Sequence, residues 1–157
     1  MNTPAHFTTP LQVQQVTGET WALLAPVQFV RANGDVITVP AGFHTDFASV
    51  PSFAWSLGFP KSGIYDAAAV VHDFLYRTHA VGPRWIERAE ADDILLEAMD
   101  ALGTGYFTAR IMYYAVRACG GSYWGDGDSA QRAAVLLLAV LLCAGCATPY
   151  DAYGMGF

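Results

Sequence analysis

Two patterns divide the chain into a strand-rich part and a helical part. Short runs of strand formers occupy the first third, at Leu11–Thr17, Thr20–Ala32 and Asp35–Val39. A loop-like segment, Pro40–Gly63, carries several glycines and prolines among aromatic residues. From Ile64 onward the sequence is typical of helices. Because strands and helices are segregated rather than alternating, the sequence predicts an α+β fold.

Turn residues predict how the strands connect. Asn33-Gly34 separates the second and third runs and is typical of a hairpin, because both residues tolerate positive φ. Pro26 has no backbone N–H, so it predicts an edge strand or a bulge within Thr20–Ala32. We therefore expect a small antiparallel sheet at the N-terminal end.

Glycines and prolines also delimit the helices. The first is expected from Ile64 to about Ala80 and the second, with Pro83 in its first turn, to about Leu102. Thr104 could cap a third helix that ends near Cys119. The first two form an antiparallel pair.

The predicted organisation is one α+β domain followed by a tail. Residues 1–124 form the domain, with its β part at about 7–50 and its helical part at about 64–120. Residues 125–157 form an apolar C-terminal helix and tail that act as a docking or membrane-contact segment. This boundary rests on the change of composition.

The tail holds most of the surplus of apolar residues. Hydrophobic residues make up 54% and charged residues 14% of the chain. From Ala133 to Tyr150 there is no charge. Three interpretations stay open: a core or subunit-contact helix, a membrane-contact segment over Ala133–Ala147, or a lipidation signal ending at Cys146. A full membrane span needs about 20 apolar residues, which is longer than this run.

Charge and cysteine content exclude other classes. The net charge of −6 gives no general attraction to nucleic acid. Cys119, Cys143 and Cys146 are an odd number and make a poor disulfide framework. The start of the chain lacks the basic and apolar regions of an N-terminal signal peptide.

A histidine, a tyrosine and an aspartate form the strongest candidate site. His72 and Tyr76 are four residues apart and share one face of the first helix. Asp92 falls on the apolar face of the second helix, where a carboxylate needs a partner. Packing of the two helices would supply His72 as that partner. His72, Asp92 and Tyr76 are therefore candidate catalytic residues, with His72 as general base.

Two further aspartates are candidate metal ligands. Asp73 points away from the His72 face and can reach a loop beside the helix. Asp46 lies in such a loop, whose carbonyls would suit a hard cation such as Ca²⁺. The structural alternatives are that Asp46 accepts turn N–H groups and that the His–Asp pair only holds two helices together.

Three motifs follow one another along the chain: ITVPAGFHTDFASVP (Ile37–Pro51), AAAVVHDFLYR (Ala67–Arg77) and ADDILLEAM (Ala91–Met99). Together they resemble the phage and prophage family catalogued as domain of unknown function 1353. The likeness covers roughly residues 7–120 and implies a phage or prophage origin.

The helix pair is also similar to that of secreted phospholipase A2 enzymes. This resemblance implies that His72 activates water, that Asp92 orients His72, and that Tyr76 hydrogen-bonds Asp92. It also implies that Asp73 holds Ca²⁺ with carbonyls of a preceding loop. The disulfides and the usual glycine-rich calcium loop of those enzymes are absent, and Thr45–Ser49 could replace the loop.

Two functions follow as expectations. The first is a Ca²⁺-assisted hydrolase that acts at the host envelope on lipid or, with the same base and metal, on another ester or amide. The alternative is a non-catalytic virion or tail protein, in which the His–Asp pair is structural and the tail packs on a partner subunit. Phage structural proteins or host envelope lipid would be the partners, and the virion or the host envelope the location.

Overall fold

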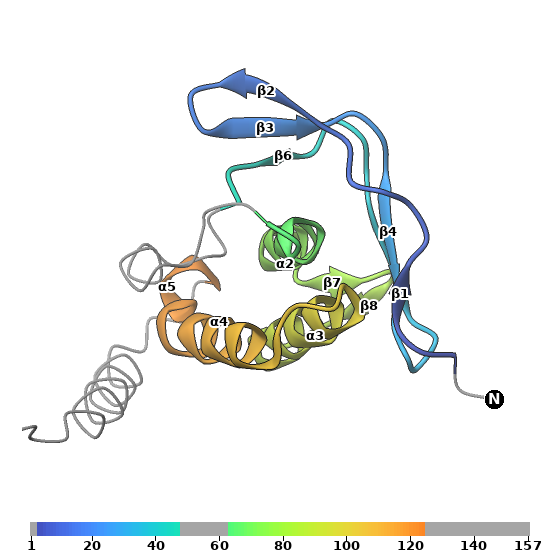
Figure 1. The fold of residues 1–157 in the computed structure, drawn as a ribbon, viewed down its shortest axis with the longest axis vertical. Helices are drawn as coiled ribbons and strands as arrows, with labels where there is room; N and C mark the ends of the chain where they lie inside the picture. Colours follow the sequence, from blue (N-terminus) through green and yellow to red (C-terminus); the bar gives the residue numbers. More distant parts are fainter. Residues whose placement is uncertain (1–2, 48–62, 125–157) are drawn as a thin grey trace, which may run out of the picture.

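The computed structural model describes residues 3–47 and 63–124 and shows an α+β fold (Figure 1). The strands are β1 (His6–Phe7), β2 (Val13–Thr17), β3 (Thr20–Leu23), β4 (Val27–Val30), β5 (Val36–Val39), β6 (His44–Thr45), β7 (Ala80–Val81) and β8 (Arg84–Trp85). The helices are α2 (Asp66–Thr78), α3 (Arg88–Ala101), α4 (Tyr106–Cys119) and the short α5 (Gly121–Trp124).

The N-terminal strands form two antiparallel sheets. One has the order β1-β4-β5 and the other the order β2-β3-β6. The run Thr20–Ala32 is therefore not one strand with an edge or bulge at Pro26, as the sequence predicted. The chain leaves the second sheet after Leu23 and enters the first at Val27. Pro26 lies at this crossing, where no ladder N–H is required.

The predicted hairpin at Asn33-Gly34 joins β4 and β5. Val30 pairs with Val36 across it, and Gly34 has a φ of +92°. Asn33 does not take positive φ, although the sequence analysis allowed it. Its side chain instead accepts a hydrogen bond from the Asp35 N–H at 2.9 Å. A single glycine thus supplies the left-handed residue of this turn.

Helix α2 lies in the middle of the molecule (Figure 1). It packs against α3, β4, β5 and α5. Its residues Ala67–His72 are all buried, because neighbours cover the helix on several sides. The helix ends at Thr78, and the next residue, His79, takes a left-handed φ of +55° and donates its N–H to the Leu75 carbonyl.

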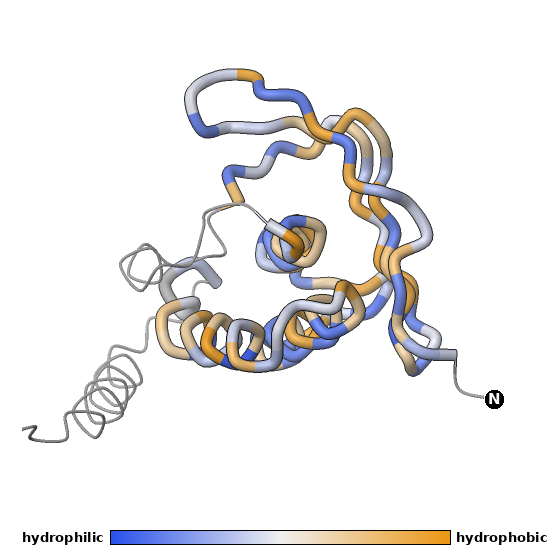
Figure 2. Tube along the Cα trace, in the orientation of Figure 1, coloured by the Kyte–Doolittle hydropathy of each residue, from blue (hydrophilic) through white to orange (hydrophobic). Residues whose placement is uncertain are grey.

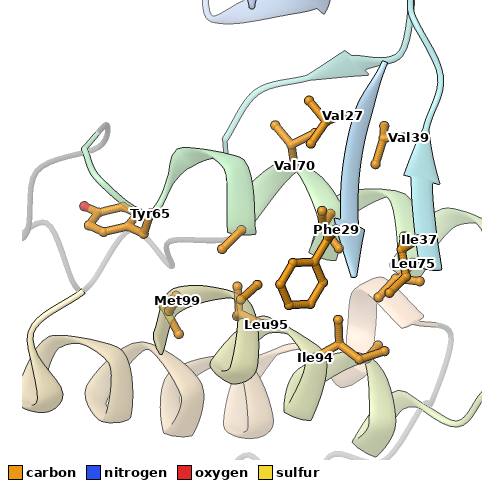
Figure 3. Packing of buried hydrophobic residues seen from close by; sticks show 14 of the residues in the cluster. Val27, Phe29, Ile37, Val39, Tyr65, Val70, Leu75, Ile94, Leu95 and Met99 are labelled. Carbon is orange, nitrogen blue, oxygen red and sulfur yellow. The ribbon is translucent and has the colours of Figure 1, made fainter. Parts of the chain in front are cut away.

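The core lies between the first sheet and the helices. Along β4 and β5 buried and more exposed residues alternate, and hydrophobic residues mark the buried positions (Figure 2). Phe29 pairs with Ile37 across the two strands. The Phe29 ring points toward Ile94 and Leu95 of α3 (Figure 3). The sheet, α2 and α3 therefore share one core, which fixes α2 against α3.

Two local predictions about the helices are wrong. Pro83 does not begin the second helix, because Gly82-Pro83 form the turn of the β7–β8 hairpin. That hairpin allows the Ile86 N–H to reach the His79 carbonyl and buries the Ile86 side chain. Thr104 does not cap α4, which starts after Gly105 without a side-chain cap. The Thr104 hydroxyl is buried without a hydrogen-bond partner.

The tail predictions fall outside the described residues. They include the apolar segment Ala133–Ala147, and Cys143 and Cys146. Within residues 3–47 and 63–124, no helix is both long and apolar enough to cross a membrane.

Candidate functional site

His72 and Asp92 meet where α2 packs on α3. His72 Nε2 lies 3.0 Å from Asp92 Oδ1. The exposed fraction is 3% for His72 and 0% for Asp92. The contact that the helical spacing predicted is therefore present, in a buried environment. The carboxylate can hold one tautomer of the imidazole, the one with its proton on Nε2.

Tyr76 lies one helical turn after His72 and binds the same carboxylate oxygen. Its hydroxyl donates to Asp92 Oδ1 at 2.6 Å, a distance typical of a strong hydrogen bond to a carboxylate. The Tyr76 and His72 rings lie 4.1 Å apart. Burial, reinforced by the negative charge of Asp92, raises the pKa of Tyr76 far above its ordinary value. The phenol therefore stays protonated and acts as a donor.

Two arginines approach the second oxygen of Asp92. Arg88 Nη1 and Arg117 Nη1 each lie 3.4 Å from Asp92 Oδ2. Arg88 Nη1 also donates to the Arg117 carbonyl at 3.1 Å. Positive charge from α3 and α4 thus compensates the buried carboxylate. Four side chains converge on one aspartate.

Neither arginine was predicted from the sequence as part of the site. Arg88 precedes Asp92 by four residues, so the i,i+4 spacing of opposite charges was a usable signal. Arg117 comes from α4. Its approach to Asp92 depends on how α4 packs on α3, and no local sequence pattern predicts that packing.

Asp73 does not face the His72–Asp92 contact and instead binds the end of β6. Its Oδ2 accepts a hydrogen bond from the Thr45 hydroxyl at 2.6 Å. The Thr45 oxygen also accepts the Phe47 N–H at 3.1 Å. Phe47 has a φ of +54°, which is strained for a bulky side chain. Thr45 therefore connects the strained Phe47 to α2, a role that was not predicted from the sequence.

The two predicted metal ligands differ in exposure. Asp46 is exposed beside Thr45, and Asp73 is partly buried. Within those residues, no group of three or more His, Cys, Asp or Glu side chains could hold a metal ion. A Ca²⁺ site at Asp73 or Asp46 would therefore need backbone carbonyls as further ligands. The rest of the predicted loop, residues 48–62, lies outside the described residues.

His79 has aromatic neighbours that the sequence analysis did not foresee. Its ring stacks on Trp124 at 4.0 Å and meets Trp85 edge-on at 4.9 Å. Trp124 in turn meets the Tyr76 ring edge-on at 5.0 Å. These contacts connect α5 to the Tyr76 side of the site.

Comparison with known proteins gives one match. The model of a family described as Protein of unknown function (DUF1353) matches residues 21–116. Neither the curated proteins nor the solved structures contain a match. The matched range includes His72, Asp73, Tyr76 and Asp92, and it ends one residue before Arg117.

Proposed function

The chain belongs to the DUF1353 family of proteins of unknown function, and we propose that it is a phage- or prophage-encoded hydrolase of an ester at the host envelope. One observation carries the proposal. His72 Nε2 lies 3.0 Å from an Asp92 oxygen that also accepts the Tyr76 hydroxyl at 2.6 Å. A histidine oriented by a buried carboxylate is a recurring general base.

The proposed step uses His72 as base and then as acid. With the Nε2 proton directed at Asp92, the lone pair of neutral His72 is on Nδ1. Nδ1 takes a proton from water while the water oxygen bonds to the ester carbonyl carbon. The imidazolium then returns that proton to the leaving alkoxide as the ester C–O bond breaks. The products are a carboxylic acid and an alcohol, and the Nε2 proton stays with the Asp92 contact.

Ca²⁺ remains part of the proposal as a requirement to be tested. Asp73 would be its carboxylate ligand, as the resemblance to phospholipase A2 implies. Because the described residues contain no group of three or more His, Cys, Asp or Glu side chains that could hold a metal ion, no step above passes through the metal. Asp46, the second predicted ligand, is exposed on the same loop end as Thr45.

The proposed substrate is a phospholipid ester. The resemblance of His72, Asp73, Tyr76 and Asp92 to the phospholipase A2 helix pair supports this class. The uncharged run Ala133–Ala147 also supports contact with a membrane, through apolar surface rather than charge. The three motifs that resemble a phage family support the virion or the host envelope as its place of action.

The burial of the site favours a second candidate, a non-catalytic virion or tail protein. His72 exposes only 3% of its surface, and two arginines compensate Asp92. In this interpretation the cluster only fastens α2, α3 and α4 together. The apolar run would then pack on a partner subunit.

Hydrolysis of vesicles separates the two candidates. The full chain is incubated with phosphatidylglycerol and phosphatidylethanolamine vesicles in Ca²⁺ and, separately, in excess chelator. The proposal predicts fatty-acid release in Ca²⁺ and loss of release on chelation. Release that persists in excess chelator would be consistent with His72 as the base, but it would contradict a requirement for Ca²⁺. No release with any divalent ion would favour the structural candidate.

A further inference from the structure

A close contact at the end of α4 adds a residue to the proposed site. Gly120 follows the last residue of α4 and packs against the Tyr76 hydroxyl. A Cβ atom built on Gly120 would overlap that hydroxyl oxygen and would lie 2.6 Å from the Val116 carbonyl oxygen. The overlap at Tyr76 falls on the atom that donates to Asp92.

Backbone conformation does not explain a glycine at this position. Gly120 has a φ of −69°, which every residue type adopts readily. Its N–H donates to the Val116 carbonyl at 2.7 Å, as any residue's N–H could. The constraint at Gly120 is therefore space, beside the Tyr76 hydroxyl and the Val116 carbonyl oxygen, and not freedom of φ.

The Tyr76 ring is held from other sides as well. Trp124 of α5 meets it edge-on at 5.0 Å, and the His72 ring lies 4.1 Å away. With the ring enclosed between these neighbours, a methyl group at Gly120 would have to displace the hydroxyl. The displacement would lengthen the 2.6 Å hydrogen bond to Asp92.

We propose that Gly120 is a positioning residue of the site, because it leaves the room in which Tyr76 reaches Asp92. Through Asp92 it sets the tautomer and ring orientation of His72. This inference rests on the proposed function. It also extends the functional unit past residue 116, where the family match ends.

The test compares Gly120→Ala with Gly105→Ala in the full chain. Gly105 stands at the other end of α4, and a Cβ there would make only an ordinary contact with the Thr108 hydroxyl at 3.9 Å. We expect Gly120→Ala to lower kcat roughly tenfold with little change in KM, because orientation and not binding is disturbed. Gly105→Ala should keep both constants.

Nitrogen NMR of the His72 ring gives a readout that does not depend on activity. We expect wild type and Gly105→Ala to hold the proton on Nε2, and Gly120→Ala to show a mixture of the two tautomers. A Gly120→Ala ring spectrum identical to wild type would overturn the positioning role, whether or not the protein hydrolyses lipid. An altered spectrum in a protein without activity would overturn only the proposed function.

If Gly120→Ala does not fold, the Tyr76→Phe variant tests the same hydrogen bond to Asp92. It removes the same hydroxyl without adding volume at Gly120. We expect it to mix the His72 tautomers in the same way. In the Tyr76→Phe background, Gly120→Ala should have no further effect on the tautomer ratio, and an additional full-sized effect would contradict the proposal.

Discussion

His72 Nε2 and Asp92 Oδ1 lie 3.0 Å apart in the interior of the domain, with Asp92 completely buried. A buried carboxylate is destabilising unless it is paired and hydrogen-bonded. Here Tyr76 shares its first oxygen, and two arginines approach the second. The same contacts can orient a base and fasten helices, so experiments must separate stability from chemistry.

Replacing Asp92 should destabilise the protein severely. Asp92→Asn leaves the Arg88 and Arg117 guanidiniums without their carboxylate, and breaking a buried ion pair costs about 3 to 5 kcal/mol. Urea denaturation measures this loss. Asp93→Asn is the matched control, because Asp93 is exposed and its carboxylate accepts a hydrogen bond from the Tyr113 hydroxyl at 2.8 Å. Equal losses for the two variants would refute the burial argument.

Thr45 should stabilise the protein through its hydroxyl. Thr45→Val keeps the shape but removes the contacts with Asp73 and the Phe47 N–H, at a cost of about 1 to 3 kcal/mol. Thr45→Ser should recover much of the loss because it restores the oxygen. Thr38→Val, at an exposed position, should change the free energy of unfolding by less than about 0.5 kcal/mol. A Thr45→Ser variant as unstable as Thr45→Val would show that the methyl group matters instead.

Stability should fall in acid partly through Glu90. Hydrogen bonds from Arg84, opposed by partial burial and aided by Arg31, lower the pKa of Glu90 below its ordinary 4.5. The folded pKa lies below the unfolded one, so this stabilisation is complete above the unfolded pKa and is lost as pH falls through the folded pKa. The advantage of wild type over Glu90→Gln should therefore shrink below pH 4.5.

Urea titrations at several pH values test this expectation. Glu87→Gln is the control, because Glu87 is exposed and lies one turn before Glu90. The Glu90 effect should also weaken in high salt, since its partners are partly exposed. A wild-type advantage of the same size at pH 3 and pH 7 would contradict the assigned sign.

The domain boundary predicts different results for two truncations. A chain ending at Trp124 keeps the α4 and α5 contacts with Tyr76, and we expect it to unfold cooperatively near the full-length Tm. A chain ending at Val116 loses Arg117 and Trp124, and its Tm should fall clearly. Circular dichroism melting measures both. If the chain ending at Trp124 did not fold, residues 125–157 would belong to the domain.

Much of the fold could be predicted from local sequence patterns. The Asn33-Gly34 turn and the strands on either side of it were readable because turn chemistry and strand formers act over a few residues. The division of Thr20–Ala32 between two sheets could not be predicted, because the composition of this run is compatible with either one strand or two. The β7–β8 hairpin was missed because Gly-Pro is compatible with both a turn and a helix start.

The candidate site, like the fold, could be predicted only in part from the sequence. Asp92 could be predicted as a site residue because it interrupts an apolar helical face. His72, a polar residue on the preceding helix, was then its expected partner. Arg117, Thr45 and Gly120 come from elements distant in the sequence. Their contacts with the site follow from tertiary packing, which no spacing rule encodes.

The most direct test of the central claim is fatty-acid release by His72→Gln beside wild type. Both full-length proteins are assayed on phospholipid vesicles in Ca²⁺, and their Tm values are measured on the same samples. Glutamine can keep a hydrogen bond to Asp92 but cannot act as a base near neutral pH. We predict release by wild type, none by His72→Gln, and similar Tm values. Equal release by the two proteins, or none by wild type, would contradict His72 as the general base.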